Sequence, residues 1–455
     1  MSSQELDSLP LSRFHWKLLL TAGLGWMFDA ADILIVGSVV AAVAREWHLD
    51  VTQSQWINTA NVAGLFFGAL AAGWFADRVG RKAVFQVTLL VYSIFTGLSA
   101  AATGIAILMA LRFLAGIGLG GELPVASTLV SEFSPAKRRG TMVVLLESFW
   151  AYGSVLAALI GFLVIPSWGW RAALLIGALP AFYVFVLRRG LPESPRFLAN
   201  QGRHAEAAAV VRLVAAESGV LAPPRRTPTE AVSGAAPSIR PRLSDLFAPS
   251  YLKRTVVLWV MWATMNLSYY GIFLWLPSQF VAKGFSLSNA LLYNLIIAIA
   301  QVPGYFVAAY LVERWGRRAT LVVFLFGAAV GAMFFGEVAL VAKDVAAILI
   351  WGSVISFFNL GAWGVVYTYT PEMYPTALRG TGAGWAAGIG RLFAFLAPLV
   401  VAYQIQLLGS DRSVFPVFAA VMVVGGLIVL AIGPETRGRT LEELTQQAAA
   451  GPALE

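Results

Sequence analysis

Two carboxylates, Asp29 and Asp32, lie in the middle of an apolar stretch that covers residues 16–43. About 20 apolar residues suffice for a helix to cross a bilayer. A carboxylate at the centre of such a helix costs about 2.5–3.5 kcal/mol unless it faces protein, water or a cavity. Residues three apart share a helix face, so both carboxyl groups point the same way. The pair predicts a proton, ion or substrate site within the membrane; the alternative is a packing contact with a basic residue.

Arg391 offers the opposite charge at a similar depth. It lies ten residues after Thr381, where the eleventh apolar span is expected to begin. At about 1.5 Å per residue this places Arg391 roughly 15 Å deep, near the bilayer midplane. A guanidinium stays charged there, and its planar fork suits a carboxylate. We expect Arg391 to contact an anionic substrate; the alternative is an ion pair with Asp29 or Asp32.

Glu122 is also expected near mid-depth, in the fourth span, with Arg112 nearer the outer end of that span. Glu147 is expected roughly 9 Å inside the fifth span. Each acid is a candidate proton carrier or a structural partner of a basic group. We assign Glu122 to proton coupling together with Asp29 and Asp32, and assign no residue to metal binding or catalysis.

Amides and aromatic rings interleave in the seventh and tenth spans. Amide edges and aromatic faces suit a small planar ring, although single aromatic residues in a membrane helix more often serve packing. The candidate substrate-binding residues besides Arg391 are Asn266, Tyr269, Tyr270, Asn359, Trp363 and Tyr367.

The composition restricts the class of protein. Of the 455 residues, 58% are hydrophobic and only 12% are charged, against about 25% charged in soluble domains. The chain has no cysteine, and its histidines, His15, His48 and His204, all lie outside the predicted spans. We therefore expect a polytopic membrane protein without disulfides, metal site or cofactor. Neither a phosphate-binding G-x-x-x-x-G-K-[ST] loop nor a nucleophile with an orienting base is present, so we expect no enzyme.

Hydropathy predicts twelve spans. They cover about residues 16–43, 55–76, 83–102, 105–130, 141–165, 171–188, 252–280, 288–312, 319–342, 345–369, 381–407 and 414–432. If both termini share one side, that side holds 25 of the 32 Lys and Arg residues and the other side holds 5. The positive-inside rule then places both termini in the cytoplasm. The net charge of +8 thus reflects topology and gives no support to nucleic-acid binding.

The long polar segment between the sixth and seventh spans divides the chain. We expect an N-terminal six-helix bundle over 1–190, a cytoplasmic linker over 191–250, a C-terminal six-helix bundle over 251–440 and a cytoplasmic tail over 441–455. The linker begins with a short surface helix and continues as a Pro-rich flexible part.

Three motifs recur between the halves at offsets of 236–242 residues. Residues 73–82, with the pattern Gly-x-x-x-Asp-Arg-x-Gly-Arg-Lys, match residues 313–318; SEFSPAKRRG at 131–140 matches PEMYPTALRG at 371–380; and PESPR at 192–196 matches PETRG at 434–438. Matches at nearly one offset indicate a duplicated six-span unit.

These motifs resemble those of the major facilitator superfamily over nearly the whole chain. The resemblance implies an all-α fold of twelve transmembrane helices in two six-helix bundles, which expose a central midplane site to one side at a time. It also implies that cytoplasmic ion-pair networks, including Glu193 and Glu435, close an inner gate; the alternative role is topology alone. The candidate gating residues are Asp77, Arg81, Glu132, Arg139, Glu313, Arg317, Glu372 and Arg379.

The stretches MFDAADILIVG at 27–37 and NLSYYGIFLWLP at 266–277 resemble the synaptic-vesicle-protein-like branch, which includes bacterial niacin transporters and neighbours the aromatic acid/proton symporters. MNLSYYGIF replaces the Gln-Gln pair of sugar porters, which disfavours a sugar. The resemblance implies a monomeric, proton-coupled importer of a small aromatic monocarboxylate in the inner membrane of a bacterium, with nicotinate the leading candidate. The alternatives are an exporter of organic cations or drugs and a non-transporting membrane sensor.

Overall fold

The computed structural model describes residue 6 and residues 9–135, 138–219, 243–374, 376–408 and 413–437. All regular structure in these ranges is helical, as expected. In the first half the helices are α1 (Arg13–Glu46), α2 (Val51–Val79), α3 (Arg81–Ser99), α4 (Ile105–Phe133), α5 (Arg139–Gly177) and α6 (Tyr183–Gly190), followed by α7 (Pro195–Asn200) and α8 (His204–Glu217). In the second half they are α9 (Pro249–Phe273), α10 (Leu276–Ala282), α11 (Leu287–Ile299), α12 (Gln301–Trp315), α13 (Arg317–Phe334), α14 (Leu340–Ala342), α15 (Val345–Tyr369), α16 (Thr376–Leu408) and α17 (Val414–Ile432).

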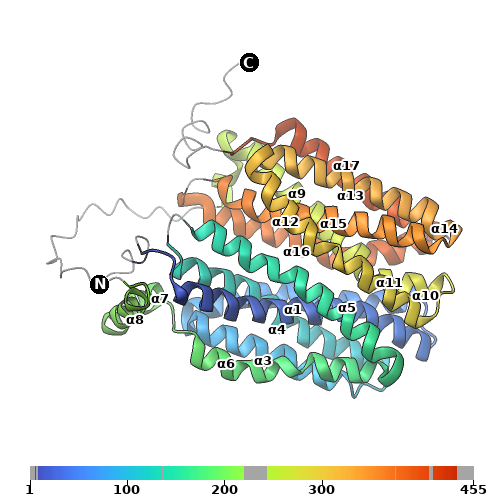
Figure 1. Ribbon diagram of the computed structural model, residues 1–455, viewed down its shortest axis with the longest axis horizontal. Coiled ribbons are helices and arrows are strands. Elements are labelled where there is room, and N and C mark those ends of the chain that lie inside the picture. Colours follow the sequence, from blue (N-terminus) through green and yellow to red (C-terminus); the bar gives the residue numbers. More distant parts are fainter. Residues whose placement is uncertain are drawn as a thin grey trace.

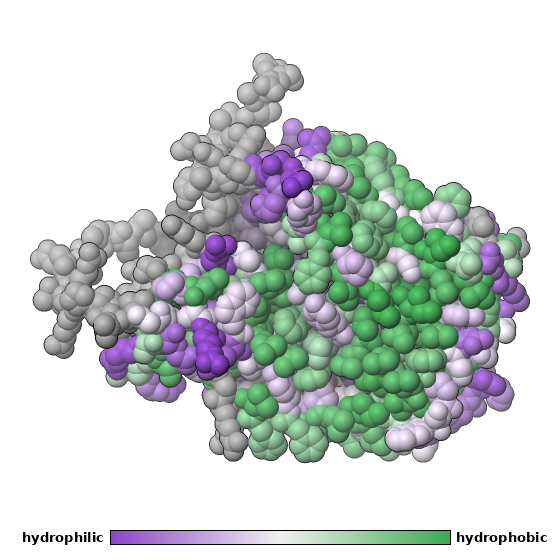
Figure 2. Space-filling view, in the orientation of Figure 1, coloured by the Kyte–Doolittle hydropathy of each residue, from purple (hydrophilic) through white to green (hydrophobic). Residues whose placement is uncertain are grey.

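The long helices form two groups that lie side by side (Figure 1). Helices α1–α6 pack mainly on one another, as do α9 and α11–α17, and the groups meet chiefly where α2 packs on α16 and α5 on α11. A wide hydrophobic band crosses the helices, with hydrophilic residues at the left and right of the view (Figure 2). The protein therefore has the expected architecture of two helical bundles within a bilayer.

Ten segments of the described residues are long and apolar enough to cross a membrane. They overlap eleven of the twelve predicted spans, because the segment Thr141–Val186 covers the fifth and most of the sixth. The missing second span is α2, whose 29 residues are long enough. Its first half contains the buried polar residues Gln55, Asn58 and Asn61, and these residue types lower its hydropathy.

Several predicted spans are broken helices. The fifth and sixth meet at Gly169, whose φ of 78° interrupts the run Arg139–Gly177, and the sixth breaks again at a 3₁₀ turn containing Pro180. The seventh divides into α9 and α10 just before Pro277, and the eighth divides into α11 and α12 at Ala300. A proline lacks the N–H that a continuous helix needs, so breaks at Pro180 and Pro277 follow from the sequence.

Glycines let α2 and α4 pack backbone to backbone. A Cβ on Gly68 would lie 2.0 Å from the Ile117 carbonyl oxygen, and one on Gly120 would lie 2.1 Å from the Leu65 carbonyl oxygen. Small residues permit such close approach between membrane helices.

We expect Gly120→Ala to destabilise the fold by about 1–3 kcal/mol, because a methyl group would push against a backbone oxygen that cannot turn away. Thermal unfolding in detergent measures the change. Gly384→Ala on α16 is the matched control, since a Cβ there meets no atom within 4 Å. Equal melting temperatures for the two variants would contradict this explanation of the packing.

Candidate functional site

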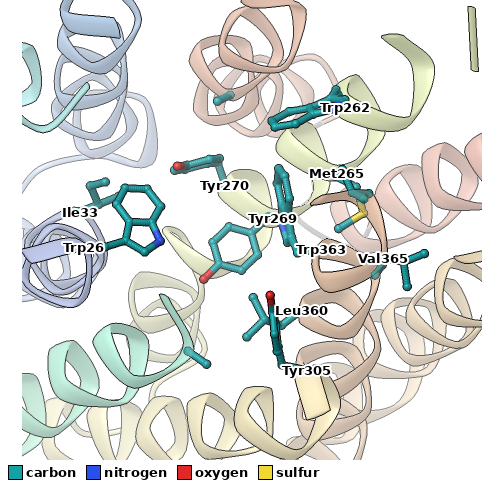
Figure 3. Packing of buried hydrophobic residues seen from close by; sticks show 14 of the residues in the cluster. Trp26, Ile33, Trp262, Met265, Tyr269, Tyr270, Tyr305, Leu360, Trp363 and Val365 are labelled. Atoms are coloured by element: carbon teal, nitrogen blue, oxygen red, sulfur yellow. The ribbon is translucent and has the colours of Figure 1, made fainter. Parts of the chain in front are cut away.

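A narrow cavity lies between the two groups of helices. Both halves contribute to its wall. The lining residues are Trp26, Glu147, Trp150, Trp262, Asn266, Tyr269, Tyr270, Tyr305, Leu360, Trp363, Tyr367 and Arg391. Figure 3 shows Trp26 of α1 on one side facing Tyr269 and Tyr270 of α9, with Tyr305 and Leu360 at another wall. A cavity shared between two packed halves is where a solute would contact both.

Aromatic rings make up most of the wall. Trp363 and Tyr367, four residues apart on α15, stack with ring centroids 5.5 Å apart and planes at 28°, and Trp262 packs its edge against both. Across the cavity, Trp150 of α5 donates a hydrogen bond of 2.6 Å from Nε1 to the Tyr269 hydroxyl of α9. Flat apolar faces with few polar groups favour a planar ring as the occupant.

Arg391 on α16 is the one basic residue in the lining. Its guanidinium Nη1 lies 3.5 Å from the Tyr270 hydroxyl. The adjacent Gly390 allows α16 to approach α9, because a Cβ there would lie 2.5 Å from the Asn266 side-chain nitrogen. Arg391 therefore lies in the wall of the cavity, where its remaining N–H groups can meet a carboxylate.

Glu147 on α5 is the one acid in the lining and is 3% exposed. Its Oε2 has no hydrogen-bond partner among the described residues. The sequence marked this residue only as a candidate proton carrier or structural partner, with no place in the binding site.

The two predicted amides differ in position. Asn266 lines the cavity, where its side-chain nitrogen donates to the Trp262 carbonyl oxygen at 2.8 Å. Asn359 is not among the lining residues; its side-chain nitrogen donates to Ser268 Oγ at 3.1 Å and joins α15 to α9. The cavity therefore holds six of the seven predicted substrate-binding residues, all except Asn359.

The predicted proton-coupling acids lie in the interior of the first half. Asp29, Asp32 and Glu122 are at most 2% exposed, and none of them is among the residues that line the central cavity. Asp32 pairs with Arg112, which is fully buried, over 3.2 Å. Glu122 accepts a 2.7 Å hydrogen bond from Thr88.

Arg112 also donates to Thr96 and Ser99 of α3. Arg112 is therefore the basic partner of Asp32, and Arg391, the alternative partner considered from the sequence, lines the central cavity instead. Asp29 lacks a hydrogen bond to either carboxylate oxygen among the described residues, and its charged neighbours include Glu122 and Asp32.

Four aromatic residues and one leucine that were not singled out from the sequence complete the wall beside the predicted set: Trp26, Trp150, Trp262, Tyr305 and Leu360. Tyr305 of α12 donates a 2.7 Å hydrogen bond to the Val144 carbonyl oxygen of α5 and so joins the two halves. In the sequence, a single aromatic residue in an apolar span gives no indication of whether it faces a cavity or a neighbouring helix. The helical spacing of Trp262, Asn266 and Tyr269 is the signal that could have identified one of the missed residues.

The duplicated motifs make matching contacts at the end of the molecule where α2 meets α3. The Glu193 carboxylate accepts from the backbone N–H of Arg81 at 3.0 Å at the start of α3, after Gly80 with φ 107°. In the second half the Glu435 carboxylate accepts from the N–H of Arg317 at 3.0 Å at the start of α13, after Gly316 with φ 90°. A positive φ favours glycine, and a helix start attracts a carboxylate.

Ion pairs extend these networks within each half. Arg81 lies 3.7 Å from Glu132, while Arg317 lies 3.0 Å from Glu372 and 3.5 Å from Glu313. The side chains of Asp77, Arg139 and Arg379 lie outside the described residues. The described pairs thus brace each half separately, and the gating role of these residues stays a prediction.

Comparisons with known proteins agree with this architecture. The family model described as "Sugar (and other) transporter" matches residues 26–448. The niacin transporter NiaP of Acinetobacter baylyi is 44% identical over 439 residues, which cover 96% of this chain and 98% of that protein. The putative niacin/nicotinamide transporter NiaP of Bacillus subtilis is 43% identical over 426 residues, 94% of this chain and 98% of that protein. The xylose transporter XylE from E. coli, in a partially occluded inward-open conformation, superposes with a TM-score of 0.76 at 16% identity, over 94% of this chain and 100% of that chain.

Proposed function

Because this chain belongs to the sugar (and other) transporter family of the major facilitator superfamily, we propose that it carries nicotinate across the membrane together with protons. Members of this family are transporters rather than enzymes. Two relatives named as niacin transporters match nearly the full chain at 43% and 44% identity, which supports nicotinate as the substrate. The mechanism we propose is alternating access, in which the two halves open the central cavity to each side in turn.

The central cavity is the single observation that carries the substrate assignment. It combines one guanidinium, Arg391, with a wall of aromatic rings. In our proposal the substrate carboxylate binds Arg391, and the pyridine ring lies against Tyr269, Tyr270, Trp363 and Tyr367. Charge-assisted hydrogen bonds and ring contacts together select a small aromatic acid over a sugar or an aliphatic acid.

The buried acids Asp29, Asp32 and Glu122 support proton coupling in this proposal. Ionisable groups inside a membrane are costly and accordingly mark proton or ion pathways. Asp29 is the one of these three acids with neither carboxylate oxygen hydrogen-bonded within the part of the chain that the structure describes. The proposal further places the protein in a bacterial inner membrane as a monomer, with both termini in the cytoplasm and the domain boundaries predicted above.

Uptake of labelled nicotinate into liposomes that contain the purified protein tests the function. We expect an inward proton gradient to drive accumulation above that in protein-free liposomes. Unlabelled nicotinate should abolish the signal, while nicotinamide and xylose, which lack a carboxylate, should compete at least tenfold more weakly, since a charged hydrogen bond contributes about 1.5–3 kcal/mol. Absence of saturable nicotinate uptake would overturn the proposal, and competition by quaternary amines instead would favour an organic cation as the substrate.

A further inference from the structure

The central cavity holds one acid and one base, and each comes from a different half of the molecule. Glu147 belongs to α5 and Arg391 to α16, and both line the same space. They form none of the described ion pairs, although Glu147 lies within the electrostatic influence of Arg391. The other groups that face Glu147 are the hydroxyls of Tyr305 on α12 and Tyr367 on α15 and the indole of Trp26 on α1.

Burial makes the charge of Glu147 consequential. The side chain is 3% exposed, and its Oε2 has no hydrogen-bond partner among the described residues. Unit charges interact much more strongly in a poorly solvated interior than in water. When the cavity is empty of solute, Arg391 can balance a negative Glu147. A second carboxylate bound to Arg391 would leave two negative charges facing one positive charge.

We propose that Glu147 carries the proton that enters with each substrate anion, because the substrate carboxylate and Glu147 share the single positive charge of Arg391. This inference rests on the proposed function, in which the substrate is an aromatic acid. In the empty cavity Glu147 is ionised and Arg391 balances it. In the loaded cavity Glu147 is protonated and Arg391 balances the substrate. Either state has no net charge, whereas binding of the anion alone or of the proton alone leaves one unbalanced charge.

The proton and the substrate follow a simple balance. One proton passes from water on the entry side to a Glu147 carboxylate oxygen, and one substrate anion passes from the same water to Arg391. On the other side both leave, and Glu147 becomes ionised again. The pair crosses as one proton and one monovalent anion, so transport is electroneutral and is driven by the pH difference.

The acids of the first half are in a different situation. Asp32 already has Arg112 at 3.2 Å, and Glu122 accepts from Thr88, so neither competes with a solute for Arg391. Asp29 also lies within the electrostatic influence of Arg391, but it is not among the residues that line the cavity. Glu147 is the acid of the lining, so solute binding at Arg391 changes its electrostatic balance directly. Proton movement is thus coupled to substrate movement at Glu147. The other buried acids, Asp29, Asp32 and Glu122, remain available to relay protons.

Two assays with the full-length protein in liposomes test this inference: nicotinate accumulation driven by an inward gradient of about one pH unit, and exchange of labelled for unlabelled nicotinate without a gradient. One proton per substrate sustains about tenfold accumulation under that gradient, because both correspond to about 1.4 kcal/mol. For Glu147→Gln, which is neutral at every pH, we expect measurable exchange but no gradient-driven accumulation. Glu147→Asp, which can still take up a proton, should retain accumulation.

Binding provides a second readout that does not depend on transport. The Kd of the wild type for nicotinate should increase as pH rises, while the Kd of Glu147→Gln should not change with pH. Full gradient-driven accumulation by Glu147→Gln would overturn the inference. A loss of gradient-driven accumulation in Glu122→Gln, with wild-type accumulation in Glu147→Gln, would overturn it as well. If the wild type itself fails to bind nicotinate, it is the proposed function that fails, so the two failures are distinguishable.

Discussion

Arg391→Ala should weaken nicotinate binding by about 30-fold or more. Removing one member of a buried, hydrogen-bonded charge pair costs about 2–5 kcal/mol, and the substrate carboxylate would be left in an aromatic cavity without a counter-charge. Arg391 is the one basic residue in the lining, so no other side chain of the described wall can replace it. Isothermal titration of detergent-solubilised protein with nicotinate measures the loss.

Two further variants make this result specific. Arg391→Lys keeps the charge but loses the planar fork, so we expect an intermediate Kd. Arg203→Ala removes an exposed guanidinium that pairs with Glu206 on the surface, and it should leave binding unchanged. Wild-type affinity in Arg391→Ala would contradict the carboxylate assignment, and tighter binding of an organic amine by that variant would support the cation alternative.

Asp32→Asn should cause the largest loss of stability, about 3–5 kcal/mol. It leaves the Arg112 guanidinium fully buried and without its 3.2 Å partner, and breaking a buried pair from one side costs energy of this order. Arg112→Gln should cost less, because a lone Asp32 can take up a proton and become neutral, whereas a guanidinium stays charged. Unfolding in detergent, monitored by the intrinsic fluorescence of tryptophan, measures both.

The double variant Asp32→Asn/Arg112→Gln serves as the control. It has no unbalanced charge, and the two amides can hydrogen-bond each other, so it should be more stable than Asp32→Asn alone. The interaction energy from this cycle separates the loss of the pair from the loss of each side chain. Simple addition of the two single effects would show that the charges do not interact across the 3.2 Å contact.

Much of the site could be predicted from the sequence because the membrane makes polar groups conspicuous. Asp29, Asp32, Glu122 and Arg391 each interrupt an apolar span at a cost that only an interior location can offset. The prediction that Arg391 lies at mid-depth needed only the helical rise, and the structure places this residue in the wall of the cavity. The contrary case is Glu147, which the sequence marked only as a candidate proton carrier or structural partner and which lies in the wall of the cavity.

The sequence by itself determined the all-α class, the apolar spans and the duplicated motifs, because hydropathy and motif spacing are properties of one segment at a time. Only the tertiary structure decided which groups meet. Arg112 pairs with Asp32, Asn359 packs on Ser268, and Glu147 shares a cavity with Arg391. The reason is that spacing defines which residues share a face of a helix, while the neighbour of that face depends on how each helix is rotated and tilted against the others.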